Sequence, residues 1–160
     1  MNPTAVRSAP ELPVIIVRSP VLPVTRVVVG VDGSAGSAAA LRWAAAEACR
    51  RQLLLRIVSA WQEPDGTAAP TAGDPARIAA ARVQKALARV LARQHYPHRI
   101  ACATPQGTPG QALLNEAGDA GLLVIGAAGV DAAQAPGTTG RYCLSRGRGP
   151  LVFVPAMLAA

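Results

Sequence analysis

The chain has 160 residues, a formal net charge of +7 at pH 7 and 51% apolar residues, few of them aromatic. This length is enough for one domain with a substantial core and too short for two. No apolar run approaches the roughly 18 residues of a membrane-spanning helix, and the opening MNPTAVRSAPELP lacks the apolar segment of a signal peptide. We therefore expect a cytoplasmic protein, and its basic surplus favours phosphate-bearing partners in general.

Three cysteines, Cys49, Cys102 and Cys143, lie far apart in the sequence. No CxxC pair or Cys/His cluster accompanies them, so we expect no metal site. An odd number of thiols in a cytoplasmic chain is typical of reduced cysteines that pack as small apolar residues.

The run RVVVGVD, residues 26–32, predicts the first regular strand. A continuous β-branched run is typical of a parallel strand that is buried on both faces. GSAGS follows, with two serines that can cap a helix, and residues 37–52 repeat small and apolar side chains at helical spacing. A second strand is predicted within residues 53–61, and the Pro- and Gly-rich segment 62–75 predicts a loop.

The segment ARIAAARVQKALARVLARQ, residues 76–94, predicts a second amphipathic helix. Its apolar face carries Val83, Leu87, Val90 and Leu91, and its opposite face carries a basic stripe of Arg82, Lys85, Arg89 and Arg93. A basic stripe can bind nucleic acid, but no aromatic side chains are interleaved for base stacking. We therefore favour a solvated helix face.

The rest of the chain continues the alternation of strand and helix. Strands are predicted at residues 99–104, 121–126 and 150–155, with helices at 111–120 and around 139–146. This alternation is typical of an open, doubly wound α/β sheet with right-handed crossovers. In such sheets, ligands bind beyond the carboxyl ends of the strands, where the strand order reverses.

Two loops are suited to that position. GVDGS, Gly30–Ser34, puts an acid at the end of the first strand, and GAAGVDAAQAPGTTG, Gly126–Gly140, follows the fourth. Glycines let backbone N–H groups approach a ligand, and Gly137-Thr138-Thr139 opens a helix whose free N–H groups attract phosphate. Neither loop has the GKS or GKT ending of a P-loop, and no GxGxxG follows the first strand, so both of those nucleotide-binding classes are excluded.

Several motifs, in this order, resemble the universal stress protein family from about Arg26 to Pro155. They are VVVGVDGSAGSAAALRWAAAEA, VSAW, QGTPGQALLNEAGDAGLLVIG, the glycine-rich loop and PLVFVP. The resemblance implies an open five-stranded parallel sheet in the order 3-2-1-4-5, with helices on both faces. It also implies ATP binding between the ends of strands 1 and 4, with the loop signature G-x2-G-x9-G-(S/T).

The resemblance gives individual residues a role. Asp32 matches the acid on the ribose and adenine side, and Ala60 matches the position whose backbone contacts adenine. Gly126 and Gly129 match the first two glycines of the phosphate loop, and Gly137 with Thr138 matches its final G-(S/T). The full set of expected nucleotide-binding residues is Gly30, Val31, Asp32, Ala60, Gly126, Gly129, Gly137, Thr138 and Thr139.

The phosphate loop departs from the family signature. Only seven residues separate Gly129 from Gly137, two fewer than the signature has, and Asp131 adds a negative charge where the phosphates would lie. An acid so close to a triphosphate could weaken binding by on the order of 1 kcal/mol. The expected ligand is ATP, AMP or ADP, with or without Mg²⁺.

The N-terminal RSAPELPVIIVR, residues 7–18, resembles the family's own last strand and is followed by the Pro-rich SPVLPVT. The chain thus resembles the second repeat of a tandem protein. Residues 1–25 would form an extension with a remnant strand and a linker, and residues 26–156 the complete domain. Edge strands invite pairing, so we expect Val14–Val17 to pair antiparallel with Leu151–Val154, within the chain or in a homodimer.

Two functions stay open on these grounds. The first is a stress-response regulator that binds an adenine nucleotide, and the alternative is a dimerising interaction module that has lost the nucleotide. No enzyme beyond a slow ATPase is expected, because His95 and His98 belong to a turn away from the glycine-rich loop and no carboxylate pair has useful spacing. Nucleic-acid binding would rest on charge alone and is not expected.

Overall fold

Six strands form one sheet in the computed structural model of the chain, which describes residues 14–16, 18, 23–67, 73–127 and 137–156. The parallel strands are β2 (Arg26–Gly30), β3 (Leu54–Val58), β4 (Ile100–Ala103), β5 (Gly121–Gly126) and β6 (Leu151–Val154). The remaining strand, β1 (Val14–Ile16), runs antiparallel to β6. The order across the sheet is β1-β6-β5-β2-β3-β4, which confirms the 3-2-1-4-5 order predicted for the parallel strands.

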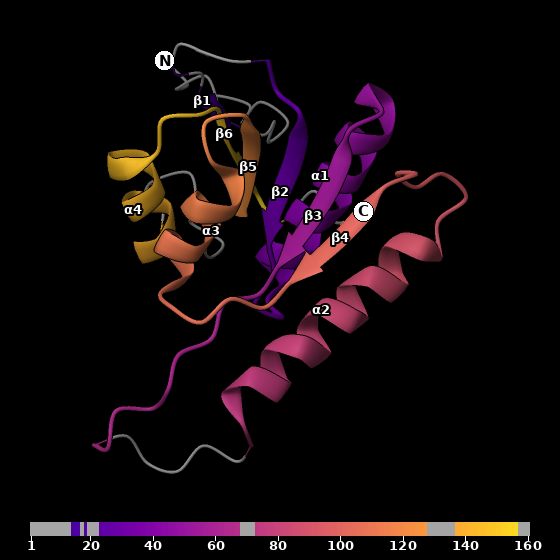
Figure 1. Cartoon of the computed structure of the whole chain (residues 1–160). Helices are drawn as coiled ribbons and strands as arrows, with labels where there is room; N and C mark the ends of the chain where they lie inside the picture. The colour runs from indigo at the N-terminus through magenta and orange to yellow at the C-terminus, as the bar shows by residue number, and fades with distance from the viewer. Residues whose placement is uncertain (1–13, 17, 19–22, 68–72, 128–136, 157–160) are drawn as a thin grey trace, which may run out of the picture.

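Helices cover both faces of this sheet (Figure 1). On one face, α1 (Ala35–Arg51) and α2 (Pro75–Leu91) share an apolar cluster with the strands. On the other, α3 (Pro109–Ala117) and α4 (Thr138–Arg146) contribute to a second cluster. The predicted doubly wound α/β architecture is therefore confirmed.

The central strand β2 shows why a continuous β-branched run predicts burial on both faces. Val27, Val28 and Val29 are each fully buried. Val27 and Val29 belong to the cluster beneath α1 and α2, whereas Val28 packs in the opposite cluster with Leu113 of α3. Successive side chains of a strand point to opposite faces, so a strand covered on both faces needs apolar residues at every position.

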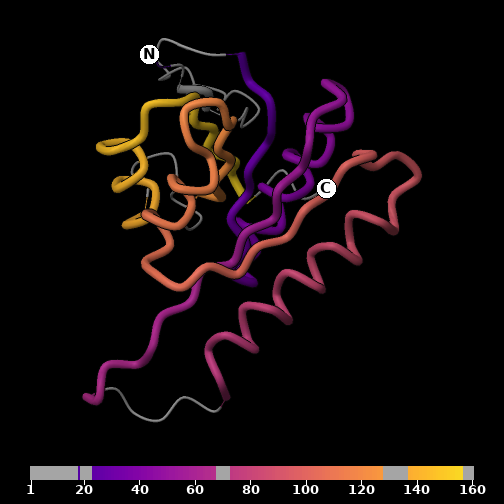
Figure 2. The backbone as a smooth tube through the Cα atoms, in the orientation of Figure 1, coloured from indigo at the N-terminus to yellow at the C-terminus, as the bar shows by residue number. Residues whose placement is uncertain are grey.

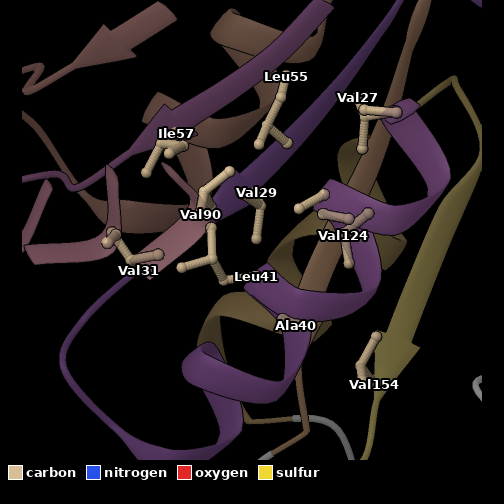
Figure 3. Packing of buried hydrophobic residues seen from close by; sticks show 14 of the residues in the cluster. Val27, Val29, Val31, Ala40, Leu41, Leu55, Ile57, Val90, Val124 and Val154 are labelled. Atoms are coloured by element: carbon tan, nitrogen blue, oxygen red, sulfur yellow. The ribbon is translucent and has the colours of Figure 1, made fainter. Parts of the chain in front are cut away.

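Small side chains bring α1 close to the sheet. Ala44 and Ala48 are fully buried, and side chains of this size let the helix backbone approach the strands without leaving voids. Figure 3 shows Leu41 of α1 and Val90 of α2 lying near Val29 of β2 in the same cluster. The small and apolar residues that the sequence repeats at helical spacing thus form the buried face of α1.

Polar side chains fix the starts of α1 and α2. Ser34 Oγ accepts a hydrogen bond from the Ser37 N–H at 3.1 Å, so a serine of the GSAGS turn caps α1 as predicted. Asp74 caps α2 by accepting from the Ala76 N–H at 3.0 Å. Pro75 stands in the first turn of α2, where its missing N–H leaves no hydrogen bond unmade.

The chain leaves the sheet after β3 and returns as α2. Figure 2 shows the chain directly after β3 running away from the sheet, and α2 lying alongside β3 and β4. The basic residues predicted for a solvated face are exposed: Arg82, Lys85 and Arg89 on α2, and Arg93 two residues beyond its end. Because α2 starts near the carboxyl edge of the sheet, its first half can contribute to a site there.

The N-terminal strand closes the sheet edge that β6 would otherwise present. The residues of β1 pair with Leu151–Phe153, and Ile15 lies opposite Val152. Arg18 then donates a hydrogen bond to the carbonyl of Gly147, just before β6. The antiparallel pairing predicted for this segment is confirmed, and it occurs within the chain.

Cys143 lies on the inner side of α4 and is only 1% exposed. Its Sγ lies 3.8 Å from the Gly110 carbonyl oxygen, to which it donates a weak hydrogen bond. Burial raises the pKa of this thiol to about 11. The thiolate is the reactive form of cysteine, and burial therefore protects Cys143 both sterically and by keeping it protonated.

We expect iodoacetamide at pH 8 to label the exposed Cys102 far faster than Cys143 in the folded protein. With a pKa of about 11, about one thousandth of Cys143 is ionised at that pH. Peptide mass spectrometry at several labelling times measures both rates. In urea the two thiols should react alike, and equal rates in the folded protein would contradict this assignment.

Among the described helices, none is long and apolar enough to cross a membrane. The described residues also contain no group of three or more His, Cys, Asp or Glu side chains that could hold a metal ion.

Candidate functional site

A cavity of about 320 Å³ opens at the carboxyl ends of β2, β3 and β5. Its lining residues are Gly30, Val31, Asp32, Ser34, Ser37, Val58, Ser59, Ala60, Arg82, Pro109, Leu113, Ile125, Gly126, Gly137, Thr138, Thr139, Gly140 and Phe153. The chain crosses from β2 to β3 on one side of this point and places β5 on the other. The cavity therefore lies where the strand order reverses, the usual ligand position in open α/β sheets.

The structure brings together eight of the nine residues predicted for nucleotide binding. Those that line the cavity are Gly30, Val31 and Asp32 after β2, Ala60 after β3, Gly126 at the end of β5, and Gly137, Thr138 and Thr139 at the start of α4. Gly129 lies outside the described residues, as does Asp131, whose charge bears on the phosphate loop.

Asp32 is held in place by the first turn of α1. One of its carboxylate oxygens accepts from the Ser34 N–H at 2.9 Å, and its own N–H donates to Ser37 Oγ at 3.3 Å. Gly33 between them has a φ of +87°, a conformation that favours glycine. Burial alone would raise the pKa of Asp32, but hydrogen bonds from Ser34 and Ser37 and the charge of Arg82 lower that pKa below its usual value. Asp32 is therefore a fixed carboxylate at neutral pH.

Arg82 brings a positive charge to the same cavity from α2. Its side chain is exposed, yet it lines the cavity beside Asp32. A Cβ atom added to Gly33 would lie 3.8 Å from Arg82 Nε, which places the guanidinium over the β2–α1 loop. The site thus combines an anionic and a cationic group at one side of its opening.

The first turn of α4 faces the cavity without a side-chain cap. The N-cap residue is Gly137, which has no side chain to accept hydrogen bonds from the N–H groups of this turn. Thr138, Thr139 and Gly140 line the cavity. Because the first N–H groups of a helix have no intrahelical acceptors, this end of α4 is suited to an anionic group such as phosphate.

Gly126 has a packing role that the sequence interpretation did not assign. A Cβ atom added here would lie 2.3 Å from the carbonyl carbon of Gly36 and 2.4 Å from its oxygen. A Cβ atom on Gly36 would in turn lie 2.8 Å from the Ala127 carbonyl oxygen. The end of β5 and the first turn of α1 therefore touch backbone to backbone, which only glycine allows on both sides.

Apolar side chains form the inner wall of the cavity. Val58, Leu113, Ile125 and Phe153 are all buried and come from β3, α3, β5 and β6. The combination of an apolar wall with a carboxylate, a guanidinium and an open helix N-terminus fits a ligand with one flat or apolar part and one anionic part.

No pair of acid–base groups accompanies this arrangement in the described part of the cavity. Asp32 is the one acid among its lining residues, and no histidine lines it. His95 and His98 are exposed between α2 and β4, which confirms their predicted place in a turn. Among its described lining residues, the cavity thus offers one carboxylate, that of Asp32, to a ligand.

The sequence matches the universal stress protein family over residues 23–155, which is more than half of the chain. The chain belongs to the universal stress protein family. No curated protein gives a significant match to its sequence.

Solved structures of other universal stress proteins share the fold of this family member. One, a universal stress protein in complex with cAMP, is 23% identical with a TM-score of 0.61, over 81% of this chain and 96% of that one. Universal stress protein UspA from Lactobacillus plantarum is 21% identical with a TM-score of 0.60, over 83% and 99%. A universal stress protein from Archaeoglobus fulgidus is 20% identical with a TM-score of 0.62, over 81% and 98%.

Four polar residues of the cavity in this universal stress protein were not among the predicted nucleotide-binding residues. Ser34 and Ser37 are the two serines of GSAGS, which were predicted to cap a helix but not to line a cavity. Ser59 directly precedes Ala60, but a lone serine after a strand carries no signal of its own. Arg82 was assigned to a solvated helix face, and only the placement of α2 reveals that it also borders the cavity.

A second hollow of about 370 Å³ adjoins the first and shares Ala60 and Arg82 with it. Trp61, Pro64 and Ile78 also line it. The Trp61 indole N–H donates to the Thr104 carbonyl at 3.0 Å, which fixes the ring on the β4 side. Arg82 therefore stands between two openings at the carboxyl edge of the sheet.

Proposed function

We propose that this protein binds an adenine nucleotide between the carboxyl ends of β2 and β5 and acts through it as a stress-response regulator. The observation that carries the proposal is one cavity lined by eight residues that the family resemblance assigns to the nucleotide. Membership of the family supports it. The structurally similar universal stress protein crystallised with cAMP supports an adenine-containing ligand.

The parts of the cavity suggest how the nucleotide lies. The Asp32 carboxylate would accept hydrogen bonds from ribose hydroxyls, and the backbone of Ala60 would contact the base. The open N-terminus of α4 would bind phosphate with its N–H groups, aided by the hydroxyls of Thr138 and Thr139. The described residues contain no metal-binding cluster. A Mg²⁺ ion that binds together with ATP would therefore be coordinated mainly by the triphosphate.

Calorimetric titration with ATP, ADP, AMP and cAMP tests this proposal. We expect micromolar binding of at least one of them, and a loss of about 10- to 100-fold in affinity for Asp32→Ala, because the variant lacks an acceptor of charge-assisted hydrogen bonds. Asp119→Ala is the matched control, since Asp119 is exposed before β5 at the opposite end of the strands. Its affinity should equal that of the wild type.

The result that contradicts the proposal is a folded wild-type protein with no binding up to millimolar nucleotide. The alternative function, an interaction module of the same fold without nucleotide, would then be favoured. Circular dichroism of each variant separates a lost ligand contact from a lost fold.

We also propose that the regulator forms a homodimer through sheet-edge strands. With β6 covered by β1, the outermost strands of the described sheet are β1 and β4, and either offers unpaired backbone groups. Light scattering after size-exclusion chromatography, with and without ATP, measures the mass.

A further inference from the structure

Ser59 is a buried serine in the wall of the nucleotide cavity. The residue directly follows β3, and its N–H donates to the Ala103 carbonyl at 3.1 Å, which anchors the backbone to β4. Ser59 is one of the residues that line the cavity, although it is only 2% exposed. Ser59 Oγ has no hydrogen-bond partner among the described residues.

A buried hydroxyl without a partner is unfavourable, and native proteins seldom leave one. The other buried serine of the cavity shows the usual arrangement. Ser37 Oγ accepts from the Asp32 N–H at 3.3 Å and donates to the Ser34 carbonyl at 3.0 Å. Burial of a serine in this region therefore does not by itself prevent hydrogen bonding, and the free hydroxyl of Ser59 points to a partner supplied by the ligand.

The neighbouring backbone offers more groups of the same kind. No described residue hydrogen-bonds to the N–H or the carbonyl of Ala60, whereas Trp61 on its other side is paired through both groups with the strand-like segment at Pro105 and Gly107. Ser59 and Ala60 thus present a donor, an acceptor and a hydroxyl that can be either. Adenine carries one hydrogen-bond donor group and several acceptors around its edge. The apolar Val58 and Leu113 line the same cavity and could pack against the faces of the adenine ring.

We propose that the Ser59 hydroxyl hydrogen-bonds to the base of the bound nucleotide and helps to determine which base is accepted. This inference rests on the proposed function, because it requires a nucleotide in the cavity. It makes Ser59 a specificity-determining residue, separate from Asp32 and from the helix N-terminus, which contact the sugar and phosphates in the proposed arrangement.

The test is calorimetric titration of the full chain and of Ser59→Ala with ATP and with four ATP analogues. Each analogue lacks one hydrogen-bonding group of the base: the 6-amino group, N1, N3 or N7. We expect ATP to bind about fivefold more weakly to Ser59→Ala, as for the loss of one hydrogen bond. For one analogue, the wild type and the variant should bind equally well, and that analogue identifies the partner of the hydroxyl.

The melting temperature of the ligand-free protein gives a second readout. Here we expect Ser59→Ala to cause no loss, in contrast to its expected loss of ATP affinity. Ser59→Ala removes a buried polar atom that has no partner, so the melting temperature of the ligand-free variant should equal or exceed that of the wild type. Ser37→Ala removes a hydroxyl with two partners and should melt lower. Ser145→Ala, on the exposed outer side of α4, is the control that should leave ATP affinity unchanged.

Two results would overturn the inference and are distinguishable from failure of the proposed function. Equal ATP affinity for the wild type and Ser59→Ala would show that the hydroxyl makes no ligand contact. An equal loss for ATP and all four analogues would show that it contacts some part of the nucleotide other than the base. A wild type that binds no adenine nucleotide at all would instead overturn the proposed function, and this inference with it.

Discussion

Replacing Gly126 by alanine is expected to lower the free energy of unfolding by about 3 kcal/mol, the upper part of the range for overpacking a core. The added methyl carbon would lie 2.3 Å and 2.4 Å from the carbonyl carbon and oxygen of Gly36. These are backbone atoms in the first turn of α1, so no side chain can rotate to make room. α1 would have to shift away from the sheet. Urea denaturation followed by circular dichroism measures the change.

Gly66→Ala is the matched control for this substitution. No atom lies within 4 Å of a Cβ added at Gly66, and a surface substitution of this kind should change stability by less than about 0.5 kcal/mol. A Gly126→Ala protein that loses less than about 1 kcal/mol would show that α1 can yield, and would contradict the packing requirement. Since Gly126 also lines the cavity, the same shift should weaken nucleotide binding.

Removing residues 1–22 is expected to lower the free energy of unfolding by about 2 kcal/mol, the sum of a few backbone hydrogen bonds, and to cause self-association. The truncation deletes β1, whose residues pair with Leu151–Phe153, and the bond from Arg18 to the Gly147 carbonyl. The uncovered β6 edge then has free N–H and C=O groups that can pair with a second copy. Urea denaturation and light scattering at several protein concentrations measure the two effects.

A shorter truncation that removes residues 1–13 is the control, because it keeps β1 and Arg18. It should retain the stability and the mass of the full chain. If the two truncated proteins show the same stability and the same mass at all concentrations, β1 contributes nothing measurable to the sheet, and the prediction is wrong.

The fold could be predicted from the sequence because its strands are parallel and buried. Runs such as Val27–Val29 have no polar face, which separates them from amphipathic helices and from half-exposed antiparallel strands. The N-terminal Val14–Ile16 could be predicted from its likeness to the last strand of the same fold, and edge-strand pairing supplied its position. What the sequence left open was whether this strand pairs within the chain, since the local pattern is the same for both arrangements.

The cavity could be predicted only where its residues belong to recognisable motifs. Asp32 belongs to the motif after the first parallel strand, and Gly137 belongs to the motif that opens the last helix; both line the cavity. The contribution of Arg82 to the cavity could not be predicted from the sequence. It depends on how α2 packs against the sheet, and the Pro- and Gly-rich sequence before α2 does not determine that packing. The burial of Ser59 and the contact of Gly126 with Gly36 likewise depend on how closely elements pack, a property that residue patterns do not encode.

The pairing of β1 with β6 has a consequence for the synthesis of the chain. Ile15 lies opposite Val152, so β1 leaves the ribosome 137 positions ahead of its partner. At ~5–20 residues per second, this interval lasts about 7–27 s. For that time the strand has no native neighbour, although the earlier strands β2, β3 and β4 can already associate. On a polysome, β1 of one nascent chain would therefore meet the completed β6 of the chain ahead of it before its own. Whether β1 pairs with its own β6 or with that of a neighbouring copy would then depend on the rate of synthesis, and low ribosome density should favour pairing within one chain.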